Sequence, residues 1–119
     1  MKDSILHQKS YAFALRMIKL YSYLVQEKKE YVMSKQILRS GTSIWALIRE
    51  AEFWQSRADF LSKLCISLKE ANETEYWISL LFDSWFLGKE EFDSIHPDIL
   101  ELVKMLASSV KTTKLSQVP

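Results

Sequence analysis

The run from Gln36 to Ile44 constrains the fold more than any other part of the chain. It places poor helix formers in the middle of a segment whose apolar residues recur at helical spacing: Ser40, Gly41, Thr42 and Ser43. A glycine in the interior of a helix costs about 1 kcal/mol relative to alanine. The run therefore predicts a helix whose small residues let a second helix approach closely. It predicts an architecture and indicates no particular chemistry.

Apolar residues recur every three or four positions in four segments, which predict helices at about residues 4–26, 33–54, 57–87 and 97–114. Ser56 and Asp59 have the spacing of a capping box that starts the third helix. We expect Gly88 to end that helix in the left-handed conformation and Pro97 to be the first residue of the fourth. Short links between long helices predict an all-α, antiparallel up-down-up-down four-helix bundle.

The link near Ser56 determines which residues of the second and third predicted helices face each other. In an antiparallel pair that turns there, Gly41 falls close to Glu70 or Ala71, and glycine against alanine would permit a tight crossing. The same register places Glu50 near Leu61 or Lys63.

The register also brings Arg39 close to Glu73. We interpret these residues as a partly buried ion pair that specifies the register. The alternative is two solvated charges.

The charges nearly cancel over the whole chain, with 16 basic and 15 acidic side chains, but they are divided unevenly. Residues 1–69 hold 12 basic and 6 acidic side chains, whereas residues 70–119 hold 4 and 9. This division suits contact between unlike surfaces of identical subunits, or a basic face for nucleic acid. The alternative is that these charges only solvate helix faces.

The length of 119 residues predicts one domain that spans residues 1–119. The first residues lack the apolar block of a signal peptide, and every apolar stretch is broken by a charge before the ~18 residues that span a bilayer. We therefore expect a cytoplasmic protein with no membrane association.

Carboxylates on two of the predicted helices raise the possibility of a metal site: Glu50, Glu70 and Glu73. Di-iron bundles also require a Glu-x-x-His motif on two helices, whereas His7 and His96 stand at predicted helix boundaries. No phosphate-binding glycine loop or activated nucleophile is evident. We expect no enzymatic activity, cofactor or metal.

Basic residues near the link into the second helix are the candidates for nucleic-acid binding: Lys28, Lys29, Lys35 and Arg39. Tyr23 and Tyr31 are available to stack on bases. Repetition of these residues in an oligomer would multiply weak phosphate contacts. The chain has no RNA-recognition signature and no strongly basic net charge, so assembly without nucleic acid is the alternative.

We expect three tryptophans to pack in the core or at an interface, because they recur at helical spacing: Trp54, Trp77 and Trp85. An excess of exposed aromatic area would indicate association with other subunits.

Residues 36–44, Glu50-Ala51 and residues 68–77 together resemble the bacterial four-helix-bundle family, also known as the 23S rRNA intervening-sequence proteins. The resemblance implies a left-handed bundle that assembles into a homopentameric ring without known enzymatic activity. It also implies a role in packing and assembly for a set of signature residues: Gln36, Arg39, Ser40, Gly41, Ser43, Glu50, Glu70, Glu73 and Trp77.

A distantly similar bundle, the accessory protein of diversity-generating retroelements, forms such a ring, binds nucleic acid and works with a reverse transcriptase. The resemblance thus implies a scaffold or RNA-associated accessory protein, and alternatively a nucleic-acid-binding accessory subunit of a reverse transcriptase. This chain departs from the family at Trp45-Ala46-Leu47, where a small residue and then Asn are common. Trp45 would fill a lumen or a seam between subunits, or change the ring size.

Overall fold

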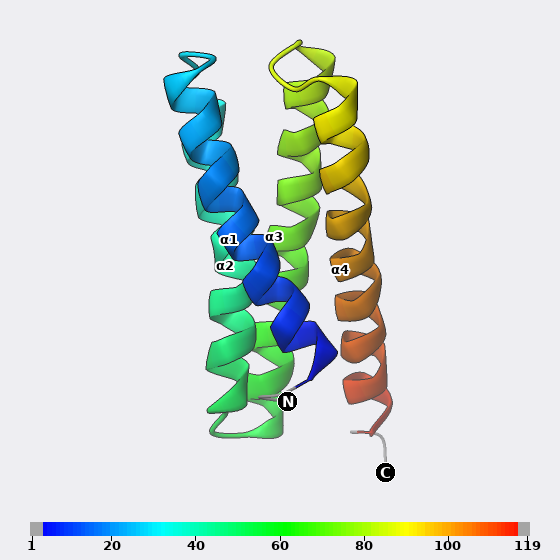
Figure 1. Ribbon diagram of the computed structural model, residues 1–119. Coiled ribbons are helices and arrows are strands. Elements are labelled where there is room, and N and C mark those ends of the chain that lie inside the picture. Colours follow the sequence, from blue (N-terminus) through cyan, green and yellow to red (C-terminus); the bar gives the residue numbers. More distant parts are fainter. Residues whose placement is uncertain (1–3, 117–119) are drawn as a thin grey trace.

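The computed structural model describes residues 4–116, which form four helices: α1 (Ile5–Gln26), α2 (Met33–Glu52), α3 (Arg57–Asp83) and α4 (Lys89–Ser116). The helices lie side by side along the long axis of the molecule (Figure 1). Each helix contacts the next one along the chain, and α4 also contacts α1. The predicted all-α four-helix bundle is confirmed, while its left-handed twist stays a prediction.

Apolar side chains from all four helices meet in one core. Each helix contributes a stripe of residues three or four positions apart, which is the pattern of a helix with one face turned inward. The largest side chains that are fully buried include Met17, Leu24, Ile37, Ile44, Ile48, Leu64, Ile78, Leu81, Ile99, Leu102 and Leu106. Their removal from water is the main force that holds the helices together.

Gly41 is buried inside α2, as predicted, but its close neighbour belongs to α1. A Cβ atom at Gly41 would lie 2.3 Å from Cγ of Met17. The tight contact is thus made with Met17 and not with Glu70 or Ala71. The physical reason is helical rotation: Ser40 faces α3, and the next residue is turned by about 100° toward α1.

The predicted register of α2 against α3 is confirmed by three interhelical contacts, in which the residue numbers rise along α2 and fall along α3. Arg39 pairs with Glu73. The hydroxyl of Ser67 donates to the carbonyl of Ile44 at 3.0 Å. One turn further on, Nζ of Lys63 lies 3.5 Å from Oε1 of Glu50.

The start of α3 is as predicted, since the Ser56 hydroxyl accepts from the backbone N–H of Asp59 at 3.1 Å. Its end differs. The helix stops at Asp83, and the residue in the left-handed conformation is Trp85, with φ of 72°, whereas Gly88 has no positive φ. The Leu81 carbonyl accepts from Phe86 N–H at 2.9 Å, and Trp85 N–H donates to Phe82. These two hydrogen bonds are those of a Schellman motif.

Pro97 was expected to start the last helix but lies inside α4, which begins eight residues earlier at Lys89. Glu90 and Glu91 in the first turn favour this start, because negative charge stabilises a helix N-terminus. Tertiary packing also holds the first two turns, since the ring of Phe92 stacks on Phe82 with centroids 4.2 Å apart. These contacts outweigh the loss of one backbone N–H at the proline.

Candidate functional site

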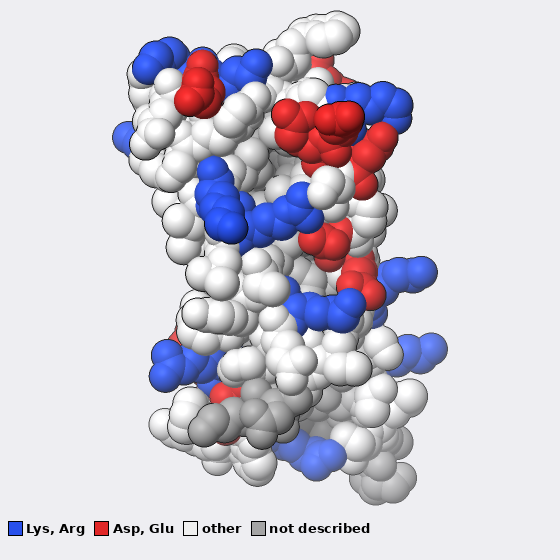
Figure 2. Space-filling model, viewed as in Figure 1, with Lys and Arg blue, Asp and Glu red and all other residues white. Residues whose placement is uncertain are grey.

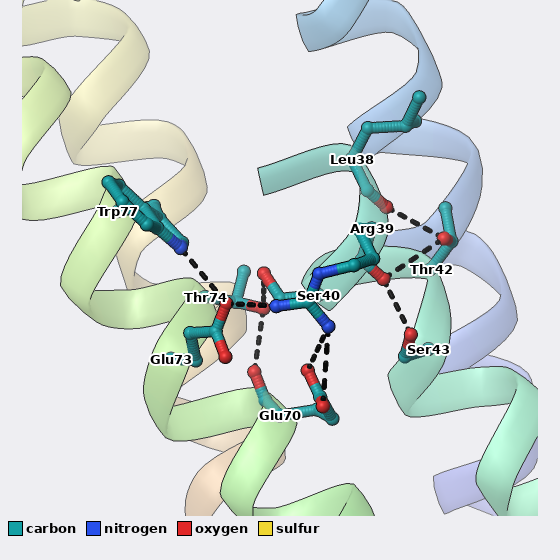
Figure 3. Close-up of polar contacts among 9 residues, drawn as sticks. All are labelled: Leu38, Arg39, Ser40, Thr42, Ser43, Glu70, Glu73, Thr74 and Trp77. Atoms are coloured by element: carbon teal, nitrogen blue, oxygen red, sulfur yellow. Dashed lines mark hydrogen bonds and ion pairs between the residues drawn. The ribbon is translucent and has the colours of Figure 1, made fainter. Parts of the chain in front are cut away.

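The most connected polar cluster lies between the middle of α2 and the middle of α3 (Figure 3). Nη2 of Arg39 pairs with Glu73, and Nη1 of Arg39 lies 3.3 Å from Oε2 of Glu70. The indole N–H of Trp77 donates to Glu73 at 3.1 Å. The predicted Arg39–Glu73 ion pair is confirmed, and the structure adds Glu70 and Trp77 to it.

The pKa values of Arg39 and Glu73 shift in opposite directions. The hydrogen bond to Glu73 raises the pKa of Arg39. Burial acts to raise the pKa of Glu73, but the hydrogen bonds from Trp77 and Arg39 outweigh burial and lower that pKa. Both shifts favour the charged forms of Arg39 and Glu73.

Beneath the ion pair, small polar residues join α2 to α3. The hydroxyl of Thr74 donates to the carbonyl of Glu70 at 2.8 Å and accepts from the hydroxyl of Ser40 at 2.9 Å. Thr74 and Ser40 are both fully buried. Thr42 and Ser43 donate to carbonyls in the preceding turn of α2. These bonds give the hydroxyls of Thr42 and Ser43 a hydrogen-bond acceptor within their own helix.

The remaining two signature residues are exposed. Gln36 lies on the outer face of α2. Glu50 pairs with Lys63, about three turns from Arg39. The predicted signature thus divides into a group in the middle of the bundle, exposed at Arg39 and buried at Ser40 and Glu70, and two surface positions.

Three of the four candidate basic residues are exposed at one end of the bundle: Lys28, Lys29 and Lys35. Lys29 has a left-handed backbone with φ of 54°. Nζ of Lys28 lies 6.0 Å from the ring centroid of Tyr23, within the range of a cation–π contact. Arg39 differs from these lysines, because its guanidinium is engaged by two carboxylates of its own subunit.

Glu30 organises this basic link, a role that the sequence reasoning missed. Its side chain is 9% exposed, and its carboxylate accepts from three backbone N–H groups at the start of α2, with the shortest contact, 2.7 Å, to Ser34. Its position three residues before the first helical residue is the available sequence signal. Glu30 thus satisfies free backbone N–H groups at the start of α2, where negative charge is also favourable.

Trp45 packs within its own subunit, against α1. Its ring lies 5.0 Å from Tyr11 and 6.1 Å from His7 between centroids, and the Arg49 guanidinium lies 5.6 Å from its centroid. Its buried indole N–H has no acceptor among residues 4–116. Trp77 also packs against the core, whereas Trp54 is 52% exposed and Trp85 is 89% exposed, so neither of these two lies in the core of its own subunit. Their packing at an interface between subunits stays a prediction.

Between Ser4 and Ser116, no group of three or more His, Cys, Asp or Glu side chains has the geometry to hold a metal ion. Within the same residues no helix is long and apolar enough to cross a membrane. Glu70 and Glu73 bind Arg39, so the carboxylates considered as metal ligands are already neutralised.

Fold and site together define an all-helical bundle protein in which the main polar cluster joins α2 to α3. A family profile described as "23S rRNA-intervening sequence protein" matches residues 2–108. The chain belongs to this family, which confirms the resemblance noted in the sequence.

Among solved structures, the chain is similar to a protein of unknown function from the S23 ribosomal protein family of Bacteroides thetaiotaomicron VPI-5482, determined at 1.70 Å resolution. The two share 58% identity with a TM-score of 0.89, over 93% of this chain and 99% of the other. A comparison with curated proteins found no match.

Proposed function

We propose that this chain is a non-enzymatic, homo-oligomeric scaffold of the cytoplasm that associates with RNA. The observation that carries the assembly is the outer face of α1. Along it, Tyr11, Leu15 and Ile18 are 46%, 46% and 49% exposed. Contiguous exposed apolar residues on a small protein mark an interaction surface.

Charge is sparse on this face. The charged side chains of α1 are Lys9, Arg16 and Lys19. Lys9 and Arg16 turn toward α4, where they pair with Glu101 and Asp98, and Lys19 is exposed at the edge of the face, beside Leu15. Depletion of charge with aromatic and aliphatic enrichment is the composition of an interface core. The α1 face is therefore the proposed seam between subunits.

The uneven charge supports contact between unlike faces of successive copies. Residues 1–69 carry 12 basic and 6 acidic side chains, whereas residues 70–119 carry 4 and 9. Figure 2 shows an acidic cluster over the upper part of α4, with basic side chains on both sides of the view. If the α1 face of one copy contacts the α3–α4 side of the next, the interface is head-to-tail. Such an interface forms a closed ring when the rotation between successive subunits divides a full turn. We propose a homopentamer, the ring of the family. Substitution Ile18→Asp should lower the molar mass in solution, whereas Phe53→Asp, at a residue that is 73% exposed in the link between α2 and α3 and lies on neither proposed face, should not.

RNA association is proposed for Lys28, Lys29 and Lys35, with Tyr23 and Tyr31 beside them. These lysines are exposed and make no ion pair within residues 4–116. A ring repeats them in every subunit, so weak phosphate contacts add up. Arg39 would add less, because phosphate would have to compete with Glu70 and Glu73.

The test is retention of a labelled 23S rRNA fragment over a salt series by wild type and by the variant K28A/K29A/K35A. We expect retention at low salt that falls with added salt, and a shallower salt dependence in the variant, by roughly 0.7–0.9 in log K against log salt for each lost contact. The matched control replaces three exposed lysines of α4, Lys104, Lys111 and Lys114, by alanine. Equal losses in both variants, or no retention by wild type at low salt, would contradict the RNA proposal.

The alternative proposal is an accessory subunit that delivers nucleic acid to a reverse transcriptase. It uses the same lysines, so single-stranded DNA of equal length belongs in the same assay. Preference for DNA together with a reverse-transcriptase gene next to the coding sequence would favour this alternative.

A further inference from the structure

A groove lies between the second half of α1 and the first half of α4. The contact between α1 and α4 is the least extensive of those between neighbouring helices. Its volume is about 490 Å³. The floor is apolar and consists of Leu20, Tyr23, Leu87 and Ile95, of which Leu87 and Ile95 are buried. In Figure 1, α1 and α4 are well separated at this end of the bundle.

The two walls of the groove carry opposite charge. Lys19 and Arg16 stand on the α1 side, and Glu90 and Glu91 stand on the α4 side. Lys19, Glu90 and Glu91 make no ion pair with any residue in the described part of the chain. The walls thus hold charges of both signs that are free to pair with a ligand.

Arg16 closes one end of the groove. Its Nη1 lies 3.0 Å from the carbonyl oxygen of Ser94 and 2.7 Å from Oδ2 of Asp98. Two turns earlier along α1, Lys9 pairs with Glu101 at 2.7 Å. These contacts join α1 to α4 on one side of Arg16, and the groove opens on the other side.

We propose that this groove binds an amphipathic helix of a partner protein, with the apolar face of that helix on the floor, an acidic edge against Lys19 and a basic edge against Glu90 and Glu91. Two helices that diverge present the surface on which a third helix packs, at an axis separation of about 8–10 Å. From Arg16 to Tyr23, α1 rises about 10 Å, which matches two to three turns of a bound helix. A nucleic-acid backbone does not fit, because its phosphates would face Glu90 and Glu91.

Tyr11 and Ile18 of the proposed seam do not line the groove. The proposal goes beyond the scaffold function, and its test does not depend on RNA binding.

The probe is a display library of helical peptides of about 14 residues, with a fixed leucine stripe and randomised flanking positions, selected on the full-length protein. We expect enrichment of sequences with acidic residues on one edge of the stripe and basic residues on the other. The affinity of an enriched peptide should fall at least about tenfold with Lys19→Glu, and likewise with Glu91→Lys, as expected when an unlike charge pair becomes a like one. Lys104→Glu, at an exposed lysine of α4 outside the groove, should change it by less than about twofold.

Circular dichroism of each variant shows whether the fold is kept, and all these side chains are exposed, so we expect it unchanged. Enriched peptides without charge asymmetry between their edges would overturn the proposal. So would equal effects of Lys19→Glu and Lys104→Glu. Peptides that release monomers from the oligomer would show that a second copy occupies the groove, which also overturns it.

Discussion

Gly41 of α2 and Met17 of α1 share a space that holds only one side chain. A Cβ on Gly41 would lie 2.3 Å from Cγ and 2.7 Å from Sδ of Met17, and Met17 is fully buried. The glycine in the middle of α2 is therefore explained by the methionine that crosses it. The helix loses intrinsic stability at Gly41, and the close packing of α1 on α2 offsets that loss.

Substitution Gly41→Ala should lower the free energy of unfolding by about 1–3 kcal/mol, because an added methyl group in a packed core forces its neighbours aside. Urea denaturation measures this change. A Met17→Ala background removes the Cγ and Sδ atoms that the added methyl would overlap and leaves only the Cβ of residue 17, at 3.3 Å. Gly41→Ala should therefore cost less there, with helix propensity offsetting part of the cost. An equal cost in both backgrounds would contradict the proposed contact.

Stability should fall in acid through two carboxylates of α3. Against the effect of burial, Trp77 and Arg39 lower the pKa of Glu73, and hydrogen bonds to Ser79 and then His96 lower the pKa of Glu75. With folded values below the ordinary 4.5, the unfolded chain binds protons first. Their contribution is therefore present above about pH 4.5 and is lost as the pH falls through the folded values.

Urea titrations at a series of pH values between about 6 and 3 measure this loss. The variant Glu73→Gln cannot titrate at this position, so its stability should depend less steeply on pH over the same range. Glu101→Gln, at an exposed carboxylate whose pKa plays no part in the prediction, is the matched control. Identical pH slopes for wild type and Glu73→Gln would refute the assignment.

Substitution Trp85→Gly should raise the free energy of unfolding by about 1 kcal/mol. Trp85 has a positive φ, and this conformation costs about 1 kcal/mol for a residue that has a Cβ atom. The side chain of Trp85 is 89% exposed, so its removal loses little packing. Trp85→Ala keeps the Cβ and should leave stability nearly unchanged. Thermal unfolding of both variants decides the point, and a stability gain with alanine as large as with glycine would exclude the backbone explanation.

The register of α2 against α3 was predictable to within about one residue, because the periodicity on both sides of one short link leaves only neighbouring alignments. One of these alignments pairs Arg39 with Glu73. Intrinsic preferences were misleading where tertiary packing decided the outcome. Stacking of Phe82 on Phe92 supports a helical start well before Pro97, and the Schellman motif forms at Trp85 although a glycine lies three residues further on.

The candidate site was predictable only in part. Exposure of the link lysines follows from their place between two amphipathic helices. The capping role of Glu30 depends on how the chain turns into α2, which periodicity does not describe. The choice of Met17 as the neighbour of Gly41 depends on the rotation of α2 between two helices, and residue spacing on one helix carries no such information.

The most direct test of the account is the molar mass of the protein in solution, measured by light scattering coupled to size exclusion at micromolar concentration. One chain has a mass of 14.0 kDa. If the outer face of α1 joins copies, the wild type should elute as a homogeneous multiple of this mass, with five as the proposed ring, and Ile18→Asp should shift it toward the single chain. A wild type that elutes at 14.0 kDa would contradict the central claim.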